Sequence, residues 1–346
     1  METKLLSDAE LEQLRSILAP KQNIVVCCHK SPDGDAMGSS LAWASYLRRT
    51  GDEGRKVTVV IPDSAPDFLR WMQGYKDVVR YEKDKELVQT LLDEADLVCC
   101  LDFNMLSRTE MMQDVLAQCK APRLLIDHHI GPDIETVMSI SHPEKSSTSE
   151  MIFRIIEQMG SYDDMTRSEA DNIYCGMMTD TGAFTYNSTD PAIFYIIGRL
   201  MEKGVDKDEI YKKVYHNYRM LALKLRSYVI WRKLRYIKAL HAAYFTLTKA
   251  EMERFHYLKG DLEGLVNEPL QVRGMKLSIS LREDTEQDNL VLVSLRSSNG
   301  FHCEEMARTY FNGGGHADAA GGKLYCSIKE AEAIANKAIL AYRGKL

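Results

Sequence analysis

The stretch Asn23–Asp35, NIVVCCHKSPDGD, runs from an apolar, β-branched segment directly into a histidine and two aspartates. Three further segments resemble its apolar half: VTVVI at 57–61, LVCCL at 97–101 and RLLI at 123–126. Continuous apolar runs of this length are typical of parallel strands that are covered on both faces. Helix-like stretches separate them at 36–49, 85–94 and 107–118. The alternation therefore predicts an α/β fold built on a doubly wound parallel sheet.

Helix-start signals continue this pattern as far as about residue 200. Ser147, Thr148 and Ser149 precede an apolar-periodic run, which makes them candidates for an N-cap. The pair Asp190-Pro191 joins a capping residue to a proline at the first helical position. A further helix is expected over 166–179. These helices complete the first domain.

The last hundred residues follow a different pattern. Strand-like runs occur at 243–247, 277–281, 290–295 and 323–327, and helix-like runs occur at 248–255, 303–311 and 329–343. This mixture predicts a smaller α+β domain. We therefore expect a catalytic domain over 1–204, a helical linker over 205–240 and a second domain over 241–346.

Charge is distributed unevenly along the chain. Residues 1–210 hold 22 Lys and Arg against 36 Asp and Glu, whereas residues 211–240 hold 9 basic residues and no acidic one. The basic segment contains no Gly or Pro and has near-helical apolar spacing, so we expect one long connecting helix. Its basic face either is simply solvated or faces phosphates or the acidic domain. The acidic chain as a whole argues against binding of long duplex DNA but leaves short oligonucleotides open.

Composition places the chain among soluble globular proteins. Of its 346 residues, 45% are hydrophobic and 27% are charged, with a formal net charge of −6. No apolar run approaches the roughly 18 residues of a membrane helix, and the acidic start lacks a secretory signal core. The eight cysteines form no CxxC pair. We therefore expect a cytoplasmic protein with reduced thiols and no membrane partner.

Metal-ligand side chains follow the predicted strands at the points where they end. The carboxyl ends of parallel strands meet at one edge of a sheet, so these side chains are expected to share a crevice. Carboxylates with imidazoles suit Mn²⁺, Mg²⁺, Fe²⁺ or Zn²⁺. Two histidines with four aspartates exceed the needs of one ion and fit two, with one shared carboxylate. The predicted metal ligands are His29, Asp33, Asp35, Asp102, His128 and Asp180.

Each of these residues also has an ordinary structural explanation when taken alone. Pro32–Asp35 suits a turn, Asp35 could cap the helix that follows, and a lone histidine is most often a surface or hydrogen-bonded residue. Together the explanations fail, because several buried acids in one crevice repel each other unless cations are present. A two-ion site that clamps a phosphoryl group predicts a hydrolase of phosphoesters or phosphoanhydrides.

The motifs resemble those of the DHH phosphoesterase superfamily. The first domain contains His29-x-x-x-Asp33-x-Asp35, Asp102, the triplet Asp127-His128-His129, and the run from Gly176 to Gly182 around Asp180. In the last domain, Gly313-Gly-Gly-His316 and the preceding Ser294-Leu-Arg296-Ser297 are similar to the signature of the DHHA1 domain. The layout is similar to the NrnA subfamily, whose members degrade nanoRNA and dephosphorylate 3′-phosphoadenosine 5′-phosphate (pAp).

The resemblance implies a role for each residue, with the active site in a cleft between the two domains. His29 and Asp33 would hold one metal, and Asp35, His128 and Asp180 the other. Asp102 would bridge the two metals, His129 would face the substrate phosphate, and Asp127 would hold its neighbouring histidine. The implied substrate-binding residues are Arg296, Gly313, Gly314, Gly315 and His316.

These roles predict a two-metal enzyme, with Mn²⁺ as the metal expected by analogy with the family and Mg²⁺ and Fe²⁺ as alternatives. Expected substrates are short single-stranded RNA or DNA oligonucleotides and pAp, with nucleoside 5′-monophosphates and AMP as products. The first alternative is a phosphodiesterase specific for the linear dinucleotides pApA or pGpG. The second, from another class, is a non-catalytic nucleotide sensor. Many relatives are dimers, so the resemblance also suggests a homodimer.

Overall fold

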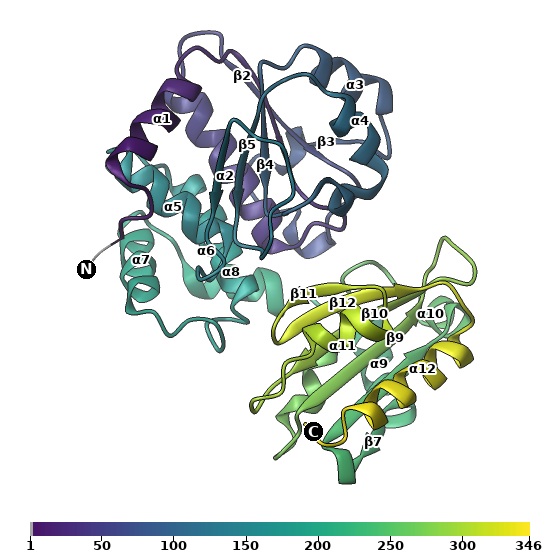
Figure 1. The fold of residues 1–346 in the computed structure, drawn as a ribbon. Helices are drawn as coiled ribbons and strands as arrows, with labels where there is room; N and C mark the ends of the chain where they lie inside the picture. Colours follow the sequence, from purple (N-terminus) through teal and green to yellow (C-terminus); the bar gives the residue numbers. More distant parts are fainter. Residues whose placement is uncertain (1–2) are drawn as a thin grey trace. The chain divides into compact units, whose positions relative to one another are not determined.

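The computed structural model describes residues 3–346, which fold into two compact units (Figure 1). The first unit extends to Asn217 and the second begins at Tyr218. Within residues 3–346, no helix is both long enough and apolar enough to cross a bilayer.

The first unit contains a six-stranded sheet in which all neighbouring strands are parallel. Its strand order is β3-β2-β1-β4-β5-β6, so the direction of winding reverses between β1 and β4. In such sheets, ligands bind at the carboxyl ends of the strands beside this reversal. The doubly wound α/β prediction is confirmed. The strands are β1 (Asn23–Cys27), β2 (Lys56–Ile61), β3 (Val79–Arg80), β4 (Leu97–Leu101), β5 (Arg123–Asp127) and β6 (Met138–Ser141).

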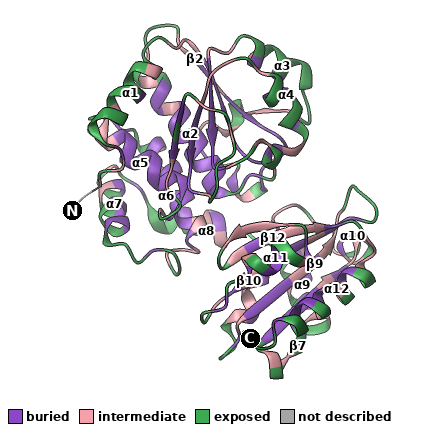
Figure 2. Cartoon of the chain, viewed as in Figure 1, coloured by how far each residue is buried: buried purple, intermediate pink, exposed green. Residues whose placement is uncertain are grey.

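Two hydrophobic clusters cover the two faces of this sheet. One face of β1 contributes Ile24 and Val26 to a large core with helices α2, α5 and α6, and the other contributes Val25 and Cys27 to a smaller core. Figure 2 shows α2 and α6 largely buried and α3 and α4 largely exposed. The strands read as continuous apolar runs because both of their faces are buried. The helices of the unit are α1 (Asp8–Leu18), α2 (Gly34–Thr50), α3 (Lys85–Asp93), α4 (Gln113–Gln118), α5 (Thr148–Gln158), α6 (Arg167–Asp180), α7 (Pro191–Glu202) and α8 (Lys207–Tyr215), with short 3₁₀ segments η1 (Asp67–Leu69), η2 (Tyr75–Asp77) and η3 (Leu106–Met112).

The predicted helix starts have the expected chemistry. The side chain of Ser147 accepts from the backbone N–H of Glu150 at the start of α5, and Asp190 accepts from Ala192 ahead of the proline that begins α7. At α2 the cap is Asp33, which accepts from the N–H groups of residues 35 and 36. Asp35 therefore does not cap the helix and is available for another role.

The basic segment 211–240 is not one long helix, so that prediction is wrong. α8 ends at Tyr215, and a second helix, α9 (Met220–Tyr228), leads into a π-helical turn η4 (Val229–Lys233) and a short strand. The apolar residues of α8 and those of α9 pack in different hydrophobic cores. Val214 packs in the core of the first unit, whereas Leu225 packs in the second. Helical periodicity cannot reveal such a change of partner.

The second unit is a six-stranded mixed sheet with helices on both faces. Its strand order is β11-β12-β10-β9-β8-β7, and only β8 and β9 are parallel neighbours. One face forms a core with α11 and α12, and part of the other face packs against α9, η4 and α10. The strands are β7 (Arg235–Ile237), β8 (Ala242–Leu247), β9 (Leu277–Glu283), β10 (Val291–Ser297), β11 (Gly314–His316) and β12 (Ala319–Leu324). The remaining elements are η5 (Lys238–Leu240), α10 (Lys249–Arg254), η6 (Leu265–Gln271), α11 (Glu304–Tyr310) and α12 (Ile328–Ala341).

Candidate metal and phosphate site

The six predicted metal ligands come together at the carboxyl edge of the first sheet. His29 follows β1, Asp102 follows β4, and His128 follows β5. Asp33 and Asp35 lie at the start of α2, and Asp180 is the last residue of α6. Parallel strands end at the same edge, so residues about 150 positions apart in the sequence become neighbours.

Asp102 lies between two groups of ligand side chains. Its Oδ2 atom is 3.5 Å from His29 Nε2, and that nitrogen is 3.9 Å from Asp33 Oδ2. Its Oδ1 atom is 3.5 Å from His128 Nε2. The same nitrogen of His128 is 3.9 Å from Asp35 Oδ2 and 3.4 Å from Asp180 Oδ2. The two carboxylate oxygens of Asp102 therefore face two different histidines.

Backbone carbonyls orient both histidines toward the cluster. His29 Nδ1 lies 2.8 Å from the carbonyl oxygen of Lys30, and His128 Nδ1 lies 3.2 Å from that of Lys145. A carbonyl can only accept, so in both rings Nδ1 carries the proton. The lone pair of Nε2 then points into the cluster, as a metal-binding imidazole requires.

The start of α5 donates hydrogen bonds to two of the carboxylates. The backbone N–H of Thr148 donates to Asp35 Oδ2 at 2.7 Å, and that of Ser149 donates to Oδ1 at 2.8 Å. The hydroxyl of Thr148 donates to Asp102 Oδ1 at 3.0 Å. Sequence reasoning assigned residues 147–149 only to an N-cap. The exposed N–H groups of a helix start can bind an anion. The predicted helix start at 147–149 could therefore have been proposed as a partner for a carboxylate.

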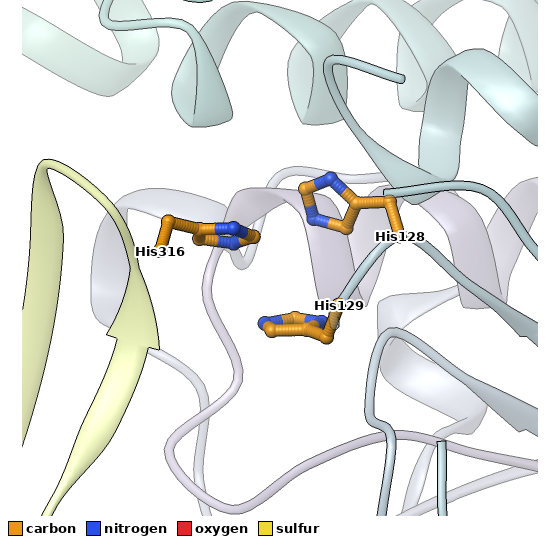
Figure 3. A group of neighbouring side chains, drawn as sticks. All are labelled: His128, His129 and His316. Carbon is orange, nitrogen blue, oxygen red and sulfur yellow. The ribbon is translucent and has the colours of Figure 1, made fainter. Parts of the chain in front are cut away.

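His129 and Asp127 form a separate pair beside the cluster. His129 Nδ1 donates to Asp127 Oδ1 at 2.7 Å, and the ring centroids of His128 and His129 are 5.0 Å apart at 71°. Both rings come from the segment that follows β5 (Figure 3). Asp127 is fully buried, and its Oδ2 atom has no hydrogen-bond partner within residues 3–346. The pair leaves Nε2 of His129 as the ring's remaining polar atom.

Burial and mutual repulsion control the charges of the cluster. Burial raises the pKa of Asp102 well above its ordinary value, and the neighbouring charges of Asp35, Asp33, Asp180 and Asp127 raise it further. Burial lowers the pKa of His29. Burial alone would raise the pKa of Asp127, but the hydrogen bond from His129 and the charge of that ring leave the pKa lowered.

This donor set fits divalent cations. Buried like charges are unfavourable unless a cation compensates them, and carboxylates with imidazoles are suitable ligands for first-row divalent metals. Two sets of three side chains, His29 with Asp33 and Asp102 and Asp35 with Asp102 and His128, have donor atoms within 4.8 Å of one another. They share Asp102.

Two glycines allow the helices behind the cluster to pack closely. A Cβ atom on Gly38 of α2 would lie 2.5 Å from the carbonyl oxygen of Asn172 in α6. A Cβ atom on Gly176 of α6 would collide with the Ser149 side chain and lie 2.9 Å from Asp35 Oδ1. The glycine of the predicted 176–182 motif therefore makes room for a ligand carboxylate and for the start of α5.

In the second unit, strand register aligns two of the predicted substrate-binding residues. Ala319 of β12 pairs with Arg296 of β10 on one side and with His316 of β11 on the other. Directly paired residues point to the same face of a sheet, so the guanidinium and the imidazole (His316 is labelled in Figure 3) extend from one face. Both residues are half-buried.

The three glycines before His316 differ in their surroundings. A Cβ atom on Gly313 would collide with the backbone of Gly321, and one on Gly315, where φ is +140°, would lie 2.5 Å from the carbonyl oxygen of Ala319. Close strand packing therefore accounts for these two glycines. A Cβ atom on Gly314 would meet nothing within 4 Å. Of the three, only Gly314 has open space on that side.

Residues 23–177 match the DHH family, N-terminal domain, and residues 242–341 match the DHHA1 domain. The bifunctional oligoribonuclease and PAP phosphatase NrnA of Thermus thermophilus is 27% identical over 315 residues, which cover 90% of this chain and 86% of that protein.

Solved structures agree with these matches. An exopolyphosphatase-related protein from Bacteroides fragilis is 42% identical, with a TM-score of 0.92 and 99% coverage of both chains. RecJ from Thermus thermophilus, solved in complex with Mn²⁺, shares the fold with a TM-score of 0.57 at 13% identity, covering 100% of this chain and 56% of that one. The chain therefore belongs to the DHH family of metal-dependent phosphoesterases and carries a DHHA1 domain after its DHH domain.

Proposed function

We propose that this protein hydrolyses short RNA oligonucleotides to nucleoside 5′-monophosphates and removes a phosphate from pAp to give AMP. One observation carries the proposal: a single buried carboxylate, Asp102, faces two separate groups of metal-ligand side chains. Two adjacent divalent cations catalyse phosphoryl transfer by stabilising both the attacking and the leaving oxygen. The similarity to NrnA, named as an oligoribonuclease and PAP phosphatase, supports the choice of substrates.

The cofactor in this proposal is a pair of divalent cations, with Mn²⁺ as the first candidate. His29 and Asp33 would hold one cation, and Asp35, His128 and Asp180 the other, with Asp102 shared between them. The similarity in fold to a manganese-bound RecJ supports this metal. When bound, the cations would supply an activated water and neutralise charge on the phosphoryl group.

The protein's own residues would orient the substrate and the ligands. Asp127 would fix the ring of His129 through Nδ1. When the ring is protonated on both nitrogens, Nε2 would donate a hydrogen bond to a phosphate oxygen. The N–H groups of Thr148 and Ser149 would keep the Asp35 carboxylate in place. Asp102, Asp127 and His129 are thus the residues on which we expect catalysis to depend most.

The second unit would bind the part of the substrate that does not react. Arg296 can grip a phosphate with two parallel N–H donors, and His316 extends from the same face of the sheet. Gly314 would let a phosphate or base approach the backbone, since that side is open. Gly313 and Gly315 would keep β11 in position for this contact.

Product analysis tests the proposal. The purified chain with Mn²⁺ is offered a labelled RNA 5-mer, pAp, the dinucleotide pApA and polyphosphate, with Asp102→Ala as the blank. Stepwise shortening of the 5-mer together with AMP from pAp supports the proposal. Cleavage of pApA alone would favour the dinucleotide-specific alternative, and phosphate release from polyphosphate alone would overturn the assignment of substrates. No turnover above the blank would favour the sensor.

A further inference from the structure

One exposed arginine beside the metal cluster has no role in the mechanism above. Arg108 lies in η3, six residues after Asp102 in the sequence. Its backbone carbonyl accepts from the N–H of Lys30 at 2.9 Å, which fixes residue 108 beside the segment that directly follows His29. Arg108 therefore belongs to the rim of the cluster.

The backbone at Arg108 is held from both sides, while its side chain extends into solvent. The N–H of Arg108 donates to the carbonyl of Met105 at 3.0 Å. The next residue, Thr109, is fully buried, and its hydroxyl donates to the carbonyl of Leu106 at 2.7 Å. The exposed guanidinium thus extends from a backbone segment that hydrogen bonds already hold in place. Less backbone entropy is therefore lost when it binds a ligand.

In the part of the chain that the structure describes, the guanidinium has no acidic partner. Within residues 3–346, Arg108 forms no ion pair and its side chain forms no hydrogen bond. The neighbouring cation Lys30 is different, because its Nζ atom lies 2.7 Å from Glu110 Oε2. Arg108 also lies close enough to His29 for its charge to help lower the pKa of that histidine, after the larger effect of burial. Among the described residues, Arg108 is therefore a cation without an acidic partner beside the metal ligands.

We propose that Arg108 binds a phosphate group of the substrate at the rim of the metal cluster. The inference rests on the proposed function, because it assigns a further contact for the same phosphoester substrates. A guanidinium matches two phosphate oxygens at once, and its N–H donors form charge-assisted hydrogen bonds. Arg108 would act as a substrate-binding residue of the first unit, in addition to Arg296 of the second.

Binding and kinetics of three variants test the proposal in the full-length, Mn²⁺-loaded protein. Arg108→Ala removes the guanidinium but keeps the backbone bond to Lys30, and Arg108→Lys keeps the charge without the two parallel donors. The matched control is Lys56→Ala, an exposed cation at the amino end of β2 on the opposite edge of the same sheet. The binding probe is a dinucleotide with a methylenephosphonate linkage, which cannot be hydrolysed, measured by calorimetry. The kinetic substrate is pApA.

Loss of a charge-assisted contact predicts about a 10- to 100-fold weaker Kd for Arg108→Ala and a similar rise in KM, with kcat within about threefold. Arg108→Lys should fall between wild type and Arg108→Ala, and Lys56→Ala should match wild type. An unchanged Kd and KM in Arg108→Ala would overturn the proposal. So would a drop in bound manganese or in melting temperature, since either would indicate a structural role.

The two hypotheses fail in different ways. If the wild-type protein shortens RNA and converts pAp to AMP as well as hydrolysing pApA, but Arg108→Ala behaves like wild type, only the role of Arg108 is wrong. If the wild-type protein neither binds the analogue nor turns over RNA, pAp or pApA, the proposed function is wrong.

Discussion

At the scale of single residues, Asp102 is the most constrained position, because four other aspartates raise the pKa of its buried carboxyl in addition to burial itself. We expect Asp102→Asn to lower kcat by about 10³-fold, since metal catalysis of phosphoryl transfer is worth several kcal/mol. In the metal-free protein, however, the same substitution should raise the free energy of unfolding by about 1 kcal/mol or more, because it removes repulsion among buried carboxylates. Activity assays, metal analysis and urea unfolding after dialysis against EDTA check both effects.

Asp96 supplies the control for this prediction. Its carboxylate accepts from the backbone N–H groups of Gln22 and Asn23 at 2.8 and 3.2 Å, away from the metal ligands. Asp96→Asn should therefore destabilise the protein by about 1 kcal/mol and leave metal binding unchanged. If Asp102→Asn destabilised the metal-free protein as much as Asp96→Asn does, hydrogen bonding rather than cation binding would account for the buried carboxylate.

Asp127 acts on the reaction through His129, which gives it a distinct kinetic effect. We expect Asp127→Asn to lower kcat by about 10- to 100-fold, the usual cost of losing a residue that orients a functional histidine. Bound metal and KM should change little, because Asp127 hydrogen-bonds His129 and not a predicted metal ligand. Combining Asp127→Asn with His129→Ala should cost little more than His129→Ala alone. Fully additive losses would mean that the two residues act independently.

At the scale of elements, the contact between α2 and α6 depends on glycine. Gly38→Ala would place a Cβ atom 2.5 Å from the backbone oxygen of Asn172, which cannot move without displacing α6. We expect a loss of about 1–3 kcal/mol in the free energy of unfolding, measured by urea denaturation. Gly198 of α7 is the control, because a Cβ atom there meets nothing within 4 Å. Gly198→Ala should stabilise the helix by up to about 1 kcal/mol, and equal effects at both positions would contradict the packing argument.

Glu251 of α10 accepts hydrogen bonds from α9 and η4. We expect these bonds to make the stability of the second unit depend on pH. The Glu251 carboxylate caps the start of α10 and accepts from Tyr228 Oη at 2.6 Å and Lys233 Nζ at 2.7 Å. Burial opposes ionisation, yet these donors leave the pKa of Glu251 lowered. A lowered pKa means that the stabilisation is present above the unfolded value of about 4.3 and is lost as the pH falls through the folded value.

We therefore expect Glu251→Gln to cost about 1 kcal/mol at pH 7 and progressively less as the pH falls below the unfolded value of about 4.3 and through the lower folded value. Thermal unfolding of both proteins between pH 3 and 7 measures the difference. A cost that stays constant across this range would show that the glutamate acts through packing and not through its charge.

The elements also show where prediction from sequence succeeds and where it fails. The strands of the first sheet are readable because burial on both faces leaves continuous apolar runs. The segment 211–240 misleads because its apolar positions keep helical spacing while Val214 and Leu225 pack in different cores. Only the tertiary contacts reveal this change.

At the scale of the whole molecule, the order of strands explains why short motifs are so informative. Asp102 and His128 are each recognised in a motif of only a few residues. The parallel sheet places His128 Nε2 3.5 Å from Asp102 Oδ1. For Thr148 and Ser149 the sequence predicts only a helix start, whose N–H groups can bind an anion. It does not identify Asp35 as the anion, because backbone N–H groups and not side-chain types hold that carboxylate. The same limit applies to Gly313 and Gly315, where backbone packing explains residues that the motif suggested were for substrate.

The distribution of ligands between the units predicts a local response to metal. All six candidate ligands belong to the first unit, so Mn²⁺ should stabilise that unit directly. A ligand present at 100 times its Kd contributes about 2.7 kcal/mol. Removing the metal with EDTA should therefore increase hydrogen exchange around residues 29–35, 102, 127–129, 148–149 and 180, whereas most of 218–346 should exchange as before. Asp102→Asn should show the metal-free pattern even with Mn²⁺ present. Equal loss of protection across both units would mean that they unfold as one cooperative body, and the metal would then be a cofactor for the stability of the entire chain.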